Sequence, residues 1–138
     1  MSSPADGPPR LSSVRYQDLA VGRRFGPFAE RLDQAASDAL RGEVGVSRAG
    51  TEAPLGVLPL LTLRVLRRAL GGIVPGGVLL GLHVTTVEGL PAAGAVDVDV
   101  HVSDQRRRPD GGLSTTFTFA LAAEGRVRAI VDWTILAP

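Results

Sequence analysis

Hydrophobic and polar positions in the second half of the chain alternate with the period of two that is typical of β-strands. In the segment 95–104 every second residue is valine, and polar residues stand between them: Asp97, Asp99, His101 and Ser103. Three further strand-like segments cover 79–88, 113–122 and 126–136, and an earlier one covers 24–32. Glycine- and proline-containing turns separate the last four, so we predict an antiparallel arrangement.

The segment 126–136 is predicted to place its apolar residues on one face and Asp132 on the other. The apolar set is Val127, Ala129, Val131, Trp133 and Ile135.

A strongly helical segment, 58–70, precedes these strands. Pro59 is tolerated in its first turn, and Gly71-Gly72 is a typical helix stop. Leucine and valine surround this helix except for an edge formed by Arg64, Arg67 and Arg68. A helix so apolar must be enclosed by other elements. One buried helix followed by an antiparallel sheet is an α+β arrangement, the hot-dog fold.

The remaining segments are predicted as follows. The segment 1–13 has almost no apolar content and is interpreted as a disordered tail, so a single hot-dog domain covers 14–138. Asp33 is the expected N-cap of a short helix that ends near residue 43. The start lacks the features of a signal peptide and no segment is long enough to span a bilayer, so we expect a cytoplasmic protein with no membrane partner.

Composition excludes several kinds of chemistry. All 15 basic residues are Arg, and the chain has no Lys, Asn or Cys. Disulfides, thiolate metal sites, cysteine nucleophiles and Schiff-base lysines are therefore excluded. With 14 acidic residues the net charge is +1, which argues against nucleic acid as a partner. We expect no cofactor and no metal site.

The opening Tyr16-Gln17-Asp18-Leu19-Ala20-Val21-Gly22, followed by Arg24-Phe25-Gly26-Pro27-Phe28, resembles the MaoC-like dehydratases, the (R)-specific enoyl-thioester hydratase branch of the hot-dog superfamily. The order of the later elements and a turn with Pro91 and Gly94 extend the resemblance from about Val14 to the end. The resemblance implies an enzyme that acts on an acyl chain or acyl thioester, free, bound to coenzyme A or bound to a carrier protein.

The family's hydratases carry an Asp and a His in a loop, usually with Asn-Pro, before the central helix. The corresponding segment here, 43–54, contains neither Asp nor His. The usual dyad is therefore missing, and a nonstandard acid–base set is required. The chemistry left open is dehydration, isomerisation or cyclisation, with a polyketide or fatty-acyl natural-product pathway as the context.

Three side chains are candidates for acid–base catalysis. Glu52 is the carboxylate nearest the position of the missing dyad, although most loop glutamates are merely solvated. Asp132 lies in an otherwise apolar strand and either reaches solvent or lines a cavity. His83 is a candidate if it faces the groove between sheet and helix; the alternative is a buried histidine at a dimer seam.

Substrate binding is predicted at the start of the central helix, where Gly56, Val57 and Leu58 present backbone N–H groups at the positive end of the helix dipole. The resemblance implies that these groups polarise a thioester carbonyl. Trp133 is a further predicted contact with the substrate. Arg107, in the basic turn Arg106-Arg107-Arg108, is a candidate contact for the phosphates of a carrier, and a solvated hairpin tip is the alternative.

A second hypothesis is a non-catalytic subunit that pairs with a catalytic homologue and shapes its acyl-binding tunnel. Hot-dog proteins pair their sheets across a dimer, so a homodimer is the first expectation and a hetero-oligomer with another hot-dog subunit the second. A ligand-binding or regulatory hot-dog domain is a third hypothesis.

Overall fold

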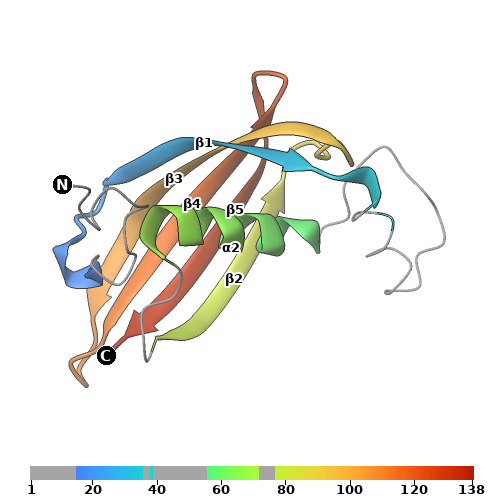
Figure 1. The fold of residues 1–138 in the computed structure, drawn as a ribbon. Helices are drawn as coiled ribbons and strands as arrows, with labels where there is room; N and C mark the ends of the chain where they lie inside the picture. Colours follow the sequence, from blue (N-terminus) through green and yellow to red (C-terminus); the bar gives the residue numbers. More distant parts are fainter. Residues whose placement is uncertain (1–14, 36–37, 39–55, 72–76) are drawn as a thin grey trace, which may run out of the picture.

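The computed structural model describes residues 15–35, 38, 56–71 and 77–138. One helix lies against a single antiparallel sheet, with the strand order β1-β3-β4-β5-β2 (Figure 1). This arrangement confirms the predicted α+β class. The elements are a 3-10 helix η3 (Tyr16–Asp18), β1 (Arg24–Leu32), α2 (Val57–Leu70), β2 (Val78–Thr86), β3 (Gly94–Arg107), β4 (Leu113–Ala123) and β5 (Arg126–Ala137).

The helix forms where its composition predicts it and ends for a local reason. Gly71 has φ 95°, a left-handed conformation that suits glycine, and its N–H donates to the carbonyl of Arg67 at 2.9 Å. Pro59 occupies the first turn, where its missing N–H breaks no hydrogen bond within the helix. The helix therefore has the predicted extent, with Val57 added at its start.

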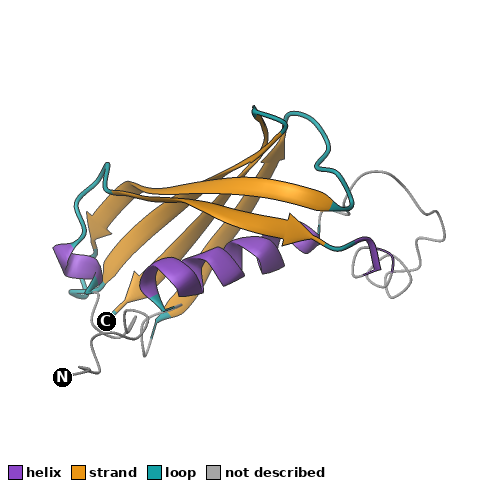
Figure 2. Ribbon diagram, turned by 45° about the horizontal axis from the view of Figure 1, so that its top comes forward, coloured by secondary structure: helices purple, strands orange, loops and turns teal. Residues whose placement is uncertain are grey.

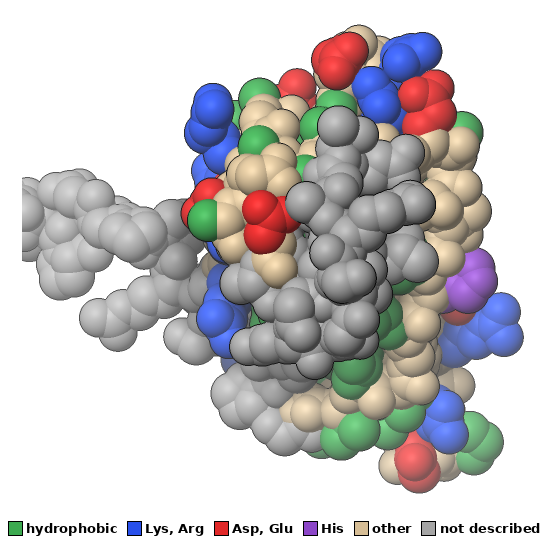
Figure 3. All heavy atoms as spheres, turned by 90° about the vertical axis from the view of Figure 1, so that its right-hand side faces the viewer, with side chains coloured by type: hydrophobic (Ala, Val, Ile, Leu, Met, Phe, Trp, Pro, Cys, Tyr) green, Lys and Arg blue, Asp and Glu red, His purple; other side chains and the backbone are tan. Residues whose placement is uncertain are grey.

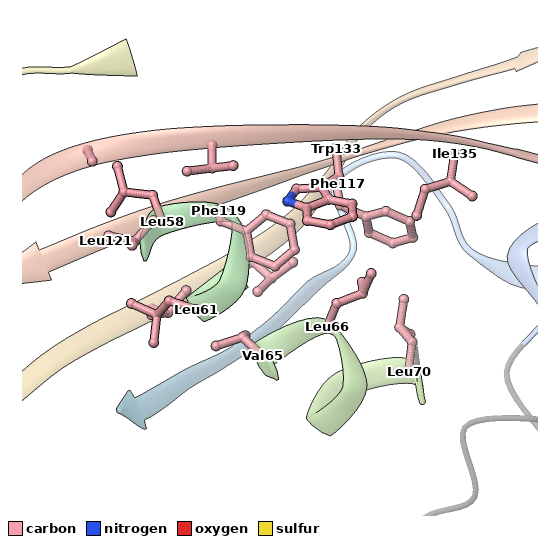
Figure 4. Close-up of a cluster of buried hydrophobic side chains, with 14 of the residues drawn as sticks. Leu58, Leu61, Val65, Leu66, Leu70, Phe117, Phe119, Leu121, Trp133 and Ile135 are labelled. Carbon is pink, nitrogen blue, oxygen red and sulfur yellow. The ribbon is translucent and has the colours of Figure 1, made fainter. Parts of the chain in front are cut away.

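The core lies between α2 and the face of the sheet that we call the helix-facing face; the opposite one is the outer face (Figure 2). Side chains from α2 point toward aromatic and aliphatic side chains of β4 and β5 (Figure 4). Phe117, Phe119 and Ile135 have no solvent exposure. Burial of apolar area at about 25 cal/mol per Å² is the main stabilising contribution here.

The alternation of buried and exposed residues predicted for β5 breaks near the start of the strand. Val127 is 45% exposed, whereas Ala129 is fully buried. Ala122 of β4 pairs with Val127 and Leu121 pairs with Ala129, so Arg128 is an extra residue in the ladder. Such a bulge shifts the facing of the side chains by one position. The prediction that Val127 belongs to the buried face is therefore wrong, while the rest of that set is buried.

Two other expectations need correction. Strand β3 continues through Arg107, so Arg106 and Arg107 belong to a strand and only Arg108 lies in the turn. Helix α2 is enclosed on one side rather than all round, because Leu60 is 61% exposed.

The Asp33 cap is present in part. Its carboxylate accepts a hydrogen bond from the N–H of Ala35 at 2.9 Å, and Gln34, Ala35 and Asp38 are helical. The predicted tail 1–13, most of the helix after Asp33 and the loop that contains Glu52 lie outside the described residues.

Candidate functional site

The start of α2 is the first component of the candidate site. Gly56 is the N-cap residue and has no side chain with which to cap the helix, and the first turn contains no acidic residue. Leu58 is 2% exposed, and Val57 is half-buried. The first backbone N–H groups thus have no capping oxygen from Gly56. This end of the helix can therefore offer hydrogen bonds and a positive partial charge to a carbonyl oxygen.

A buried hydrogen bond ties the first half of α2 to β5. The indole Nε1–H of Trp133 donates to the hydroxyl of Thr62 at 2.8 Å. Thr62 Oγ1 lies 3.0 Å from each of the carbonyl oxygens of Leu58 and Pro59. Trp133 is 5% exposed and Thr62 is fully buried. The polar atom of Trp133 is thus engaged by the helix, and its ring lies in the core with Phe117 and Phe119 of β4 (Figure 4).

Sequence reasoning missed Thr62. The signal was present, because Thr62 is the polar residue on the otherwise apolar, sheet-facing side of α2. A buried hydroxyl requires a partner, and the indole N–H of Trp133 supplies it.

The outer face brings two predicted catalytic residues together. Asp132 of β5 is the direct cross-strand partner of His83 on β2 and of Thr118 on β4. The Thr118 hydroxyl donates to Asp132 Oδ1 at 2.6 Å, and Ser103 Oγ lies 2.8 Å from Thr118 Oγ1. The ring Nδ1 of His83 lies 3.5 Å from Thr85 Oγ1. Asp132 therefore has a hydroxyl on one side and an imidazole on the other.

This pair lies on the opposite face of the sheet from the helix. Trp133 and Asp132 are consecutive strand residues, so their side chains point to opposite faces, as predicted. His83 is exposed and does not face the groove between sheet and helix, which was the condition for its action there. The predicted catalytic and substrate-binding residues thus form two separate groups within one chain.

A third group, absent from the sequence predictions, centres on Glu30. Its side chain is 7% exposed and contacts Arg68 through Oε2. Arg68 also donates to the carbonyl of Ala29 at 3.0 Å and stacks over the Phe28 ring at 5.1 Å. Glu30 Oε1 is buried without a hydrogen-bond partner, 3.7 Å from Arg64 Nη1. The signal in the sequence is the alternation Phe28, Glu30, Leu32, which places a carboxylate among inward-facing residues.

The basic residues at the end of β3 are engaged locally. Arg107 Nη1 donates to the carbonyl of Gly111 at 3.0 Å, and Arg106 Nε lies 3.0 Å from Asp104 Oδ2. An open pocket of about 400 Å³ lies nearby, lined by Val78, Asp110, Gly111, Gly112, Leu136, Ala137 and Pro138. The carboxylate of Asp110 in this lining accepts a hydrogen bond from the N–H of Gly112 at 2.9 Å, and a carboxylate at this position disfavours an anionic ligand.

Within the described ranges, no group of three His, Cys, Asp or Glu residues is arranged to hold a metal ion. No helix in the described part of the chain is both long and apolar enough to cross a bilayer.

The chain is similar in structure to several solved proteins. A MaoC-like dehydratase from Rhodospirillum rubrum superposes with a TM-score of 0.74 and 18% sequence identity, over 91% of this chain and 97% of that one. The (R)-hydratase from A. caviae involved in PHA biosynthesis gives a TM-score of 0.63 and 18% identity, over 87% of this chain and 97% of that one. The C-terminally truncated HadBC complex of Mycobacterium tuberculosis, a 3R-hydroxyacyl-ACP dehydratase, gives a TM-score of 0.63 and 13% sequence identity. The match covers 83% of this chain and 93% of that one.

No family model matches the sequence, and no curated protein matches it. The structural similarity confirms the hot-dog fold and the predicted resemblance to MaoC-like dehydratases at the level of fold.

Proposed function

We propose that this protein acts on an acyl chain or acyl thioester, using dehydratase-, isomerase- or cyclase-type chemistry with a nonstandard acid–base set. The observation that carries the proposal is the start of the central helix at Gly56, an N-cap residue that makes no side-chain cap hydrogen bond. The buried Thr62–Trp133 contact anchors the first half of the same helix to β5. Backbone N–H groups at a helix start stabilise negative charge that develops on a carbonyl oxygen. They require no dyad side chain, so they persist in a chain that lacks the dyad.

The acid–base residues are proposed as two separate hypotheses. Glu52 is the proposed general base at the helix start, because the segment 43–54 leads directly into α2. Asp132 and His83 form a second proposed pair on the outer face, with Thr118 orienting the carboxylate. A ligand held at Gly56 by one chain does not touch this second pair, since the sheet lies between them.

Single substitutions distinguish the two hypotheses. Turnover of saturated, 2-enoyl and 3-hydroxyacyl thioesters would be followed by mass spectrometry for Glu52→Gln, Asp132→Asn and His83→Gln. Loss of a general acid or base lowers turnover by about 10²–10⁴-fold. Asp97→Asn is the matched control, because Asp97 is an exposed carboxylate on the outer face.

If Glu52→Gln alone loses activity, the base at the helix start is supported. If only Asp132→Asn and His83→Gln lose it, the outer-face pair is supported. Wild-type turnover that none of the three substitutions reduces would contradict both residue assignments.

A second candidate function is favoured by strand β2. This strand pairs with β5 along one edge, and no described strand covers its other edge. Four apolar side chains on it are 40% to 55% exposed: Val78, Leu79, Leu80 and Leu82. Hydrophobic side chains reach the surface among charged ones in the side view of Figure 3. An exposed apolar strand edge is suited to pairing with another strand.

We therefore propose that β2 pairs with a second hot-dog chain, first of all a copy of itself. The alternative is a non-catalytic subunit that shapes the acyl tunnel of a catalytic homologue. The similar structure HadBC, a 3R-hydroxyacyl-ACP dehydratase, is itself described as a complex. Native mass spectrometry of the protein purified from its source cell measures the partner and any retained acyl ligand together. A second hot-dog chain in the complex supports the alternative, and an active homodimer contradicts it.

A further inference from the structure

Three arginines project from the exposed side of α2. Arg64, Arg67 and Arg68 lie at spacings of three and four residues, so they share one side of the helix. The side chains of Arg64 and Arg68 are 63% and 47% exposed, and Arg67 is also exposed. Their guanidinium groups therefore reach solvent from an element whose other side is in the core.

Buried Glu30 underlies this cluster. One carboxylate oxygen pairs with Arg68, which also bonds to Ala29 and stacks on Phe28, so its guanidinium is held in a defined position. Arg64 Nη1, at 3.7 Å from the other oxygen, is beyond hydrogen-bond distance. Arg67 has no ion-pair partner in the described part of the chain. Among the described residues, three guanidinium groups against one carboxylate leave a local charge of +2.

Helix stability does not account for this charge. Basic residues in the last turn interact favourably with the helix dipole, which explains Arg67 and Arg68. Arg64 stands in the middle of the helix, where that effect has faded. Its positive charge is three and four residues from two others, an arrangement that destabilises a helix by a few tenths of a kcal/mol per pair. A multiply charged anion on this side of the helix would offset the repulsion.

We propose that Arg64 and Arg67, with Arg68 held by Glu30, bind the phosphate of the phosphopantetheine arm that carries the thioester. This inference rests on the function proposed above and names the group that α2 recognises at a distance from the thioester. Arginine is suited to this task because its planar donors match the oxygens of a phosphate group.

The spacing along the helix agrees with this assignment. At 1.5 Å per residue, Arg64 lies about 10 Å and Arg68 about 16 Å from Val57 along the axis. A fully extended phosphopantetheine arm measures about 15 Å from sulfur to phosphorus, if each of its bonds spans the same length as a bond in an extended polypeptide chain. A thioester carbonyl at the helix start would thus place its phosphate within the range of the arginine cluster.

The basic residues at the end of β3 are a weaker candidate for the same phosphate. Arg106 is paired with Asp104, and Arg107 is bonded to the carbonyl of Gly111. Binding a phosphate there requires these contacts to be replaced, and Asp110 adds a negative charge to the adjacent turn. The two clusters are therefore compared directly in the test.

The test is calorimetric titration of the full chain with pantetheine, 4′-phosphopantetheine and coenzyme A. Wild type should bind 4′-phosphopantetheine at least about tenfold more tightly than pantetheine, and Arg64→Ala/Arg67→Ala should abolish that difference. Arg24→Ala/Arg31→Ala is the matched control, since both residues are exposed on β1 and the change in net charge is the same. It should retain the tenfold difference.

Coenzyme A and 4′-phosphopantetheine distinguish the two sources of the phosphate. Tighter binding of coenzyme A supports a nucleotide-linked thioester at this cluster, and equal binding supports an arm attached to a carrier protein.

Three results would overturn the inference. They are an unchanged phosphate preference in Arg64→Ala/Arg67→Ala, an equal loss in the β1 control, or a loss confined to Arg106→Ala/Arg107→Ala. Failure of the proposed function has a different signature, in which wild type neither binds nor turns over acyl-pantetheine thioesters. If those thioesters bind but the preference for 4′-phosphopantetheine over pantetheine is unchanged in Arg64→Ala/Arg67→Ala, only the inference fails. Circular dichroism of each variant confirms that it is folded.

Discussion

The hydrogen bond between Trp133 and Thr62 makes the stability of the core depend on one buried hydroxyl. In Thr62→Val the shape of the side chain is retained and the hydroxyl is replaced by a methyl group. Trp133 Nε1–H, which now donates to that hydroxyl at 2.8 Å, is then left without its partner in a position where the residue is 5% exposed. Both Thr and Val are β-branched, so helix propensity changes little.

The expected cost follows from the loss of one partner of a buried pair. A buried donor without an acceptor costs about 1–3 kcal/mol, and the gain from a buried methyl group is about 0.8 kcal/mol. The difference is a net loss of roughly 0.2–2.2 kcal/mol in the free energy of unfolding, with a midpoint of about 1.2 kcal/mol. For a domain of this size the midpoint lowers Tm by roughly 3–6 °C.

Fluorescence of Trp133 measures the effect, since it is the single tryptophan in the chain. Urea titrations of wild type and Thr62→Val should give a lower midpoint with the same slope, which indicates a change in stability alone. Thr62→Ser is the matched control, because it keeps the hydroxyl and removes a methyl group. It should lose about 1 kcal/mol from the smaller buried area.

The double variant with Trp133→Phe separates the hydrogen bond from packing. Because this substitution removes the single tryptophan, urea unfolding of all four proteins in this cycle is followed by far-UV circular dichroism. With the donor also absent, adding Thr62→Val should cost less than it does in wild type, because no N–H is left unpaired. A Thr62→Val protein as stable as wild type would refute the assignment. So would an equal effect of Thr62→Val in the presence and absence of the indole.

Three further predictions follow from burial and charge. Leu82→Arg on the exposed edge of β2 should dissociate the proposed dimer in size-exclusion chromatography with light scattering, whereas Val127→Arg should leave its mass unchanged. Phe119→Ala should lower the free energy of unfolding by about 3–5 kcal/mol, while Val127→Ala should change it by less than about 0.5 kcal/mol in the same urea titration. Glu30→Gln should lower the free energy of unfolding by about 1–2 kcal/mol, less than the loss of a fully buried ion pair because Arg68 is 47% exposed. An unchanged Tm in thermal unfolding would show that the pair contributes nothing to stability.

Most elements of the fold are predictable from local patterns. The valines of β3 recur at every second position, and only one register buries all four against a core. Gly71 ends α2 because few other residues adopt φ 95° without strain. These signals act within one or two turns of the chain, so the sequence reveals them directly.

The bulge at Arg128 is not visible in such a pattern. The alternation of Val127, Ala129 and Val131 is regular, yet pairing with β4 inserts Arg128 as an extra residue. Arg128 Nη1 donates to the carbonyl of Gly89 at 3.1 Å, a contact between segments far apart in the sequence. Local periodicity contains no information about that partner, so the face assigned to Val127 was wrong.

The features of the candidate site likewise fall into those predictable from the sequence and those that only the folded structure reveals. The sequence by itself determined the hot-dog class, the apolar helix with a glycine at its start, and the absence of Asp and His from the segment 43–54. Each of these depends on residue type and short-range spacing. Only the tertiary structure decided that His83 stands opposite Asp132 on the outer face, and that Glu30 lies buried beneath the helix arginines. The physical reason is that register and packing bring together residues 38 or more positions apart, and the free energy of such contacts depends on neighbours that no local pattern specifies.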